Sequence, residues 1–205
     1  MEIEKVLQAM RLFVGNDPLR EIFHKPYEQE GFYYATDAHA LIRLDGSFNL
    51  GIASQDRPKT KDVIKPNTIE PVEINLVELE TYLDSITPEV ADTYECNECE
   101  GFGTEECNLG HEHDCEECDG EGTLTYDPVR FVKDRYAKYK IWDGVISRLQ
   151  LQKMFDACKI LGVEKINRVA GKGNLQYKFE TDKILFLVMP IMDSGENDEY
   201  IKTNL

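Results

Sequence analysis

Four cysteines in two matching turns are the residues best suited to carry chemistry. The first turn holds Cys96 and Cys99, the second holds Cys115 and Cys118, and both read C-x-x-C-x-G-x-G. A C-x-x-C turn points two thiolates at one point, so two turns complete the tetrahedral shell that zinc prefers. The repeated glycines allow a positive-φ path on which backbone N–H groups face the sulfurs. We therefore predict one zinc ion at these cysteines, with a pair of disulfides as the alternative.

The other thiols and histidines of this region carry weaker signals. A closed four-thiolate shell has no open position for water, so the predicted zinc is structural and supplies folding free energy. Cys107, His111 and His113 lie between the two turns and form either a second metal site or a polar loop tip. Cys158 falls on a predicted helix, where we expect a buried apolar residue.

The net charge of −16 is confined to one part of the chain. Residues 66–129 contain 19 Asp and Glu and neither Lys nor Arg, so the remaining 20 acids and 23 bases sum to +3. A shift of this kind marks a module boundary. The longest apolar run, 184–192, is interrupted by Pro190 and is shorter than the roughly 20 residues that a spanning helix needs. With an acidic, amphipathic N-terminus that does not resemble an export signal, we expect a cytoplasmic protein.

The two cysteine turns also resemble a known repeat. CNECEGFGT and CEECDGEGT are similar to the zinc repeats of DnaJ-type co-chaperones at every Cys and Gly. That family uses four repeats for two zinc centres, whereas this chain has two repeats and room for one. An HPD triad, the J-domain signature, is missing from the sequence, so we do not transfer co-chaperone activity. The resemblance implies a DnaJ-type zinc finger, which elsewhere serves as a protein-interaction or peptide-binding surface.

Helix and strand patterns lie on both sides of the acidic region. Amphipathic spacing and caps predict helices over 3–14, 76–86 and 148–161, with Ser147 as an N-cap and Gly162 as a stop. The predicted strands cover 32–35, 38–44, 130–140, 175–180 and 184–189. The last of these is apolar throughout, which indicates a central strand. The polar segment 51–68 is predicted as a linker, and the acidic tail after Met192 is expected to fray.

Two long phrases of the sequence resemble a bacterial DNA polymerase sliding-clamp (β-clamp) domain. KVLQAMRLF…GFYYATDAHALIRL is similar to its first half, which ends in a T-D-G-H-R-L-like sequence. The stretch from GVISRLQLQKMFDACKIL to LQYKFETDKILFLVMPIM is similar to its second half, including a V-M-P-M motif. The resemblance implies an α+β fold: a single clamp-like domain with two helices packed on β-sheets and pseudo-twofold symmetry. An inserted zinc-knuckle hairpin would separate its halves.

These patterns together divide the chain into modules. We expect the clamp-like domain at 1–50 and 130–192, the linker and helix of the insert at 51–92, and the zinc finger at 93–125. The acidic tail takes 193–205.

The clamp resemblance also implies a binding pocket. In that family the T-D-G-H-R-L strand and the V-M-P-M tail line an apolar pocket that docks short peptides of polymerases and other partners. The matching positions are Thr36, His39, Leu41, Val188, Met189 and Pro190. The family pocket lies between consecutive domains, so we expect strand 36–41 of one subunit to meet tail 188–190 of another. Ala38 and Ala40 replace the family's Gly and Arg. The alternative is that these apolar residues are core and that His39 is a satisfied surface histidine.

A basic segment offers contacts for nucleic acid. The candidates are Arg130, Lys133, Arg135, Lys138 and Lys140. Against Asp134 they give +4 in eleven residues, enough for nonspecific phosphate contacts. The equal alternative is that this segment neutralises the adjacent acidic insert.

Three functions follow from these observations. The leading hypothesis is a non-enzymatic accessory protein of DNA replication or another DNA transaction, a clamp-like scaffold that binds partner peptides and contacts DNA as a homo-oligomer. The second is a zinc-finger protein-interaction or chaperone-like module displayed on an α+β frame. The third, an enzyme acting on a small-molecule substrate, finds no support, because the sequence has no G-x-S-x-G, P-loop or H-E-x-x-H motif.

Overall fold

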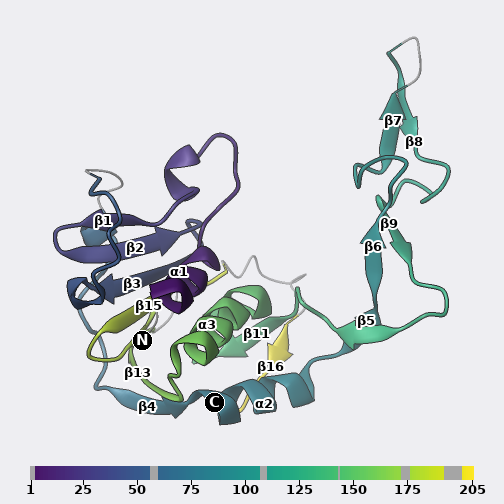
Figure 1. The fold of residues 1–205 in the computed structure, drawn as a ribbon. Coiled ribbons are helices and arrows are strands. Elements are labelled where there is room, and N and C mark those ends of the chain that lie inside the picture. Colours follow the sequence, from purple (N-terminus) through teal and green to yellow (C-terminus); the bar gives the residue numbers. More distant parts are fainter. Residues whose placement is uncertain (1–2, 56–59, 107–109, 143, 172–175, 192–199) are drawn as a thin grey trace. The chain divides into compact units, whose positions relative to one another are not determined.

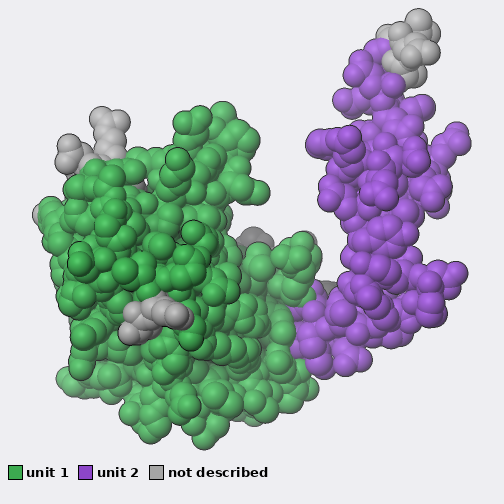
Figure 2. Space-filling view, viewed as in Figure 1, with its two compact units in different colours: residues 1–86, 135–205 green, residues 87–134 purple. Residues whose placement is uncertain are grey.

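The computed structural model describes the whole chain except residues 1–2, 56–59, 107–109, 143, 172–175 and 192–199. It divides into two compact units (Figure 2). We call residues 1–86 and 135–205 the frame unit, and residues 87–134 the cysteine unit. Among the described helices, none has the length and apolar character needed to cross a membrane.

The frame unit is built on a seven-stranded antiparallel sheet (Figure 1). In spatial order its strands are β1 (Tyr27–Gln29), β2 (Phe32–Thr36), β3 (Ala40–Asp45), β15 (Ile184–Val188), β14 (Tyr177–Glu180), β13 (Lys165–Ala170) and β4 (Val72–Asn75). The parts of the frame unit that precede and follow the cysteine unit in sequence meet at β3 and β15, where Ala40 lies opposite Val188 and Leu44 lies opposite Ile184. All five residues of β15 are buried, which confirms the prediction of a central strand.

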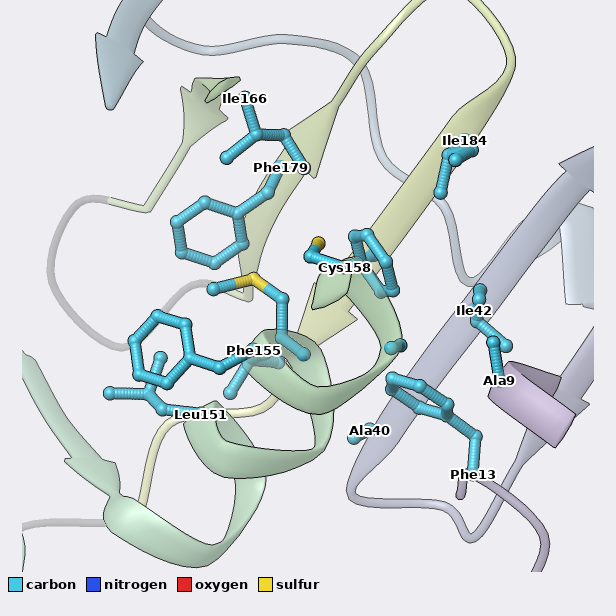
Figure 3. Close-up of a cluster of buried hydrophobic side chains, with 14 of the residues drawn as sticks. Ala9, Phe13, Ala40, Ile42, Leu151, Phe155, Cys158, Ile166, Phe179 and Ile184 are labelled. Carbon is cyan, nitrogen blue, oxygen red and sulfur yellow. The ribbon is translucent and has the colours of Figure 1, made fainter. Parts of the chain in front are cut away.

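Within the described part of the frame unit, the sheet is accompanied by the α-helices α1 (Ile3–Arg11), α2 (Leu76–Ile86) and α3 (Arg148–Leu161). The side chain of Ser147 accepts the N–H of Leu149, and Gly162 ends α3 with φ +70°, both as predicted. The apolar sides of α1 and α3 pack with alternate residues of the strands in one large core, as Ala9, Phe155 and Phe179 do in Figure 3. Short 3₁₀ helices cover Glu21–Phe23, Gly46–Phe48 and Thr60–Asp62.

The other face of the sheet carries a smaller core. Its buried members are Tyr27, Tyr34, Leu41, Leu185 and Leu187, with Ile64 packed against them. Gln176 Nε2 donates to the carbonyl of Val63 at 2.7 Å, and Lys178 Nζ donates to that of Lys65 at 3.0 Å. The segment 60–65, expected from its polar composition to be a linker, therefore covers part of this face.

Helix α2 belongs to the frame unit, whereas the sequence pattern assigned it to the insert. Strand β4 directly precedes α2 and pairs with β13, and Leu76, Leu79 and Leu83 are buried in the main core. The start of the insert was predicted too early, because the acidic segment begins at Pro66, before β4 and α2. The described residues of the frame unit thus include three α-helices, whereas two were expected for the clamp-like domain.

The expected single strand over 130–140 is wrong. Strand β10 (Phe131–Lys133) lies in the cysteine unit, and β11 (Lys138–Ile141) lies in the frame unit. Strand β11 sits between β12 (Gly144–Ser147) and β16 (Ile201–Lys202) in a separate three-stranded sheet. The end of the acidic tail, expected to fray, is thus paired at Ile201 and Lys202, and the tail's first part lies outside the described residues.

The cysteine unit consists of short antiparallel strand pairs. Its strands are β5 (Glu89–Ala91), β6 (Thr93–Glu95), β7 (Thr104–Glu106), β8 (Glu112–Asp114), β9 (Thr123–Thr125) and β10. Strand β5 pairs with β10, β6 with β9, and β7 with β8. The two cysteine turns connect β6 to β7 and β8 to β9, so each strand pair brings the turns toward each other.

Truncation of Leu83 tests the packing of α2. Leu83 is 2% exposed in the main core, so Leu83→Ala is expected to lower the free energy of unfolding by about 2–5 kcal/mol in urea titrations. Val77→Ala on the same helix, 60% exposed, is the matched control and should change it by less than about 0.5 kcal/mol. Equal effects at the two positions would contradict the placement of α2 in the frame unit.

Candidate functional site

The structure brings together the four cysteines predicted as metal ligands. All four are buried, and their Sγ atoms lie within 4.8 Å of one another. Cys96 and Cys115 are 3.9 Å apart at Sγ, and Cys99 and Cys118 are 3.7 Å apart. Sulfurs bound at 2.3 Å around a tetrahedral zinc stand about 3.8 Å from one another, whereas a disulfide needs about 2.05 Å. The spacing therefore fits a shared metal ion.

The two turns present the same hydrogen bonds to their sulfurs. The N–H of Gly103 donates to Sγ of Cys99, and the N–H of Gly122 donates to Sγ of Cys118, both at 3.2 Å. Such second-shell donors stabilise negative charge on a metal-bound thiolate. This is the arrangement that the repeated glycines predicted.

The same glycines let the two turns interlock. Gly103 and Gly122 have φ of +75° and +73°, a region that favours glycine. A Cβ at Gly103 would overlap the carbonyl oxygen of Gly120, and a Cβ at Gly122 would overlap that of Gly101. Each turn therefore packs its backbone against the last glycine of the other.

Hydrogen bonds and burial act in opposite directions on these thiols. Burial opposes ionisation of Cys99, yet the N–H of Gly103 and the neighbouring thiols bring the pKa of Cys99 below its ordinary value. Burial holds the pKa of Cys118 above its ordinary value. Besides the cysteines themselves, Leu124 is the hydrophobic residue found packed in this cluster among the described residues. A metal ion would supply the cohesion that apolar packing does not.

The remaining cysteine and histidine candidates are placed separately. Cys107 lies outside the described residues, and His111 is exposed. Nδ1 of His113 lies 2.8 Å from the carbonyl oxygen of Glu105, which engages that ring nitrogen. Cys158 is 1% exposed on α3, and burial raises its pKa to about 12, so it is an apolar core residue as predicted.

A second candidate site is an apolar hollow of about 180 Å³ in the frame unit. Its lining residues are Phe23, Thr36, Ala38, His39, Ala40, Leu41, Thr60, Val63, Leu187 and Met189. This set includes four of the six predicted pocket residues. Val188, by contrast, is buried in the main core, and Pro190 is not among the lining residues. Phe23, Thr60 and Val63 also line the hollow, although no motif in their segments predicted a binding role.

Both walls of this hollow come from one chain. Strands β3 and β15 are neighbours in the sheet, and the N–H of Met189 donates to the carbonyl of His39 at 2.9 Å. The expectation that strand 36–41 of one subunit meets tail 188–190 of another is therefore wrong for this hollow. Strand pairing within the frame unit already joins the two segments.

The turn from Thr36 to Ala40 shapes one wall. Thr36 Oγ1 donates to the carbonyl of Ala40 at 2.8 Å and accepts the N–H of Ala38 at 3.0 Å. Asp37 Oδ1 accepts the N–H groups of His39 and Ala40, both at 2.8 Å. Ala38 has φ +76°, the backbone region for which the clamp-like motif supplies Gly.

The candidate nucleic-acid residues divide between the two units. In the cysteine unit, Arg130 pairs with Asp92 at 2.6 Å and stacks on Tyr126, and Lys133 pairs with Glu89 at 3.3 Å. Two of the five bases therefore neutralise acidic neighbours, which was the alternative for this segment.

The other three bases lie in or beside β11 of the frame unit. Arg135 lies over the ring of Tyr136 at 5.2 Å, and Lys140 Nζ donates to the hydroxyl of Tyr200 at 3.3 Å. Lys138 begins β11, where it pairs with Ser147.

The ion pairs between α2 and α3 were not predicted from the sequence. Arg148 pairs with Asp84, and Lys159 pairs with Glu80, both at 2.7 Å. The partners are more than sixty residues apart in sequence, so only the packing of α2 beside α3 reveals them.

Comparison with known proteins identifies relatives of the fold. No protein-family model matches the sequence, and no curated protein is recognisably similar to it. A DnaN sliding clamp (DNA polymerase III subunit beta) from Bartonella birtlesii, bound to griselimycin, aligns with a TM-score of 0.52 at 10% identity, over 92% of this chain and 63% of that one. A DNA polymerase sliding clamp from Bacillus subtilis aligns with a TM-score of 0.52 at 11% identity, over 92% and 62%.

The chain therefore has a clamp-like mixed α/β fold with antiparallel sheets. It spans less than two thirds of the length of these clamps. At this identity, the likeness concerns the fold alone.

The interlocked glycines generate a test of the metal centre. Gly103→Ala places a Cβ against the backbone of the other turn and is expected to weaken Zn²⁺ binding at least about tenfold in a chelator competition, equivalent to about 1.4 kcal/mol. Gly110→Ala is the matched control, because Gly110 has a similar φ of +76° but only a side-chain atom nearby, 3.5 Å away. If both variants bind Zn²⁺ equally, the interlock does not support the site.

Proposed function

We propose that this chain is a non-enzymatic accessory protein of DNA replication or another DNA transaction, a clamp-like scaffold that binds partner peptides. The observation that carries the proposal is the apolar hollow. It lies on a clamp-like fold and is lined by Thr36, His39, Leu41 and Met189, four of the positions at which the resemblance implies a peptide pocket.

The hollow suits an apolar side chain of a partner peptide. Two of its hydroxyls are engaged within the chain, since Thr36 bonds to Ala40 and Thr60 bonds to Tyr27. An apolar cavity of roughly 150 Å³ is large enough to bind benzene, so about 180 Å³ accommodates one aromatic or branched aliphatic side chain. Burying such a side chain contributes about 1.5–3 kcal/mol, so contacts outside the hollow would have to supply the rest of the affinity.

Griselimycin is a suitable probe, because the Bartonella birtlesii clamp carries it. We expect it to bind this chain in isothermal titration calorimetry. Met189→Glu should weaken binding at least about tenfold, because the hollow would then hold an unpaired charge. Met189 is 37% exposed, so the variant is expected to fold.

Val77→Glu, on the exposed side of α2, is the matched control and should bind like the unmodified chain. Absence of binding, or equal binding by Met189→Glu, would contradict the role of the hollow.

We further propose that Cys96, Cys99, Cys115 and Cys118 hold one structural zinc ion. The sulfur spacing, the paired N–H donors and the small apolar core of the cysteine unit support this assignment. When bound, the ion would fix the two turns and leave no coordination position for a substrate. The residues themselves shield the sulfurs from water and hold their orientation.

DNA contact and oligomerisation belong to the same proposal. We also propose that the scaffold acts as a homo-oligomer, in which copies of the clamp-like fold would associate head to tail. Arg135, Lys138 and Lys140 of the frame unit are the proposed phosphate contacts. We do not assign this role to α3, because Arg148 and Lys159 are neutralised by carboxylates of α2.

A salt-dependent gel shift tests the DNA contact. The intact chain is expected to shift duplex DNA near 50 mM salt and to lose binding near 200 mM, as counterion release requires. Lys138→Ala combined with Lys140→Ala should reduce the salt slope by about two, whereas Lys133→Ala, in the cysteine unit, should leave it unchanged. No shift at low salt would overturn the DNA contact while leaving the peptide-binding role intact.

A second candidate function rests on the surface of the cysteine unit. Residues 87–134 contain 15 acids and two bases, a charge of −13, and Phe102 at the first turn is 79% exposed. An acidic surface with one protruding aromatic ring suits a basic protein partner, as in a zinc-finger interaction or chaperone-like module. A pull-down with Phe102→Ala distinguishes this alternative, since loss of partners would assign binding to the cysteine unit rather than the hollow.

A further inference from the structure

The 36–40 turn forms an ion pair with Lys153, a residue that does not itself line the hollow. Lys153 lies on α3, and its ammonium pairs with Oδ2 of Asp37, 116 residues away in sequence. The two side chains are only 22% and 15% exposed, so water screens this pair weakly. Burial would raise the pKa of Asp37, but Lys153 and the backbone N–H groups of Ala40 and His39 hold it below its ordinary value.

The carboxylate of Asp37 connects this pair to the wall of the hollow. Its Oδ2 faces Lys153, while its Oδ1 accepts the N–H groups of His39 and Ala40 at 2.8 Å. A carboxylate can rotate about its own axis, so a cation fixed on one oxygen determines where the other points. The backbone of the hollow's wall is therefore held through Asp37 by the ammonium on α3.

The turn needs such support because its backbone is unfavourable. Ala38 has φ +76°, a region that side chains with a Cβ rarely adopt. Conformations of this kind persist where the surrounding structure over-determines them. Here the surroundings are the hydroxyl of Thr36 and the Asp37–Lys153 pair.

We propose that Lys153 is a positioning residue for the hollow: it fixes Asp37, Asp37 fixes the backbone of residues 38–40, and α3 thereby sets the affinity of the hollow for its partner side chain. The affinity part of this proposal rests on the proposed peptide-binding function. The positioning of the turn does not depend on it.

The experiment uses the full chain and two independent readouts. The first is amide hydrogen exchange at His39 and Ala40, followed by NMR without any ligand. The second is the dissociation constant for griselimycin. Lys153→Met removes the charge and keeps an apolar side chain, and we expect about tenfold faster exchange at both amides and about tenfold weaker binding.

Two controls separate positioning from general stability. Lys153→Arg keeps a cation within reach of Asp37 and should return both readouts to within about threefold of the unmodified chain. Lys159 lies on the same helix as Lys153 but pairs with Glu80 of α2. Lys159→Met breaks that ion pair and should change neither readout. If Lys153→Met does not fold, Asp37→Asn is the alternative variant. Its side-chain oxygen can still accept the N–H groups of His39 and Ala40, but it has no charge to attract Lys153, so it should show the same two changes.

The outcomes are distinguishable. Faster exchange in Lys153→Met with no griselimycin binding by any form supports the positioning of the turn and contradicts the proposed function. Unchanged exchange at His39 and Ala40 overturns the proposal. So does faster exchange throughout the frame unit that Lys153→Arg fails to rescue, because Lys153 would then be a structural residue only.

Discussion

The antiparallel pairing of β3 with β15 is the constraint on which the rest of the frame unit depends. It joins segments from opposite ends of the sequence, and its register places Ala40 beside Val188. Residues of these strands on one side enter the main core, including Ile42 and Phe186, whereas Leu41 and Leu187 enter the smaller core on the other side. The hollow lies where this pair ends. Core and candidate binding site therefore share one set of strand hydrogen bonds.

The two units are stabilised by different physics. The frame unit buries a large apolar core, and the ion pairs between α2 and α3 add charge neutralisation at its surface. Among the described residues of the cysteine unit, the hydrophobic cluster contains four thiols and one partly buried leucine. Its 15 acidic side chains also repel one another, and two bases offset only part of that charge. Backbone contacts between the two turns are present in the structure, and the proposed metal ion would add the cohesion that this small cluster does not provide.

Local patterns predicted the parts of the structure that local physics determines. The cysteine turns, the Ser147 cap, the Gly162 stop and the central position of β15 all follow from nearby residues. Long-range pairing was not accessible in this way. The place of β4 and α2 depends on β13, which the sequence pattern missed, and the pairing of Arg130 and Lys133 with acids depends on how β5 meets β10. The single-chain origin of the hollow required the register of β3 against β15.

The pairing of β5 with β10 has a consequence for how the chain tolerates its insertion. Glu89 lies opposite Lys133, so the 48 residues of the cysteine unit leave and re-enter at neighbouring positions. A metal ion bound to both turns would cross-link the segment between β5 and β10 and shorten the loop that it forms. The entropic cost of closing a loop rises with the logarithm of its length, so shortening the path from Glu89 to Lys133 about twofold would lower that cost by about 0.6 kcal/mol. The cysteine unit therefore interrupts the frame unit at one place in the sequence, between Ile86 and Arg135, and closes on itself through β5 and β10.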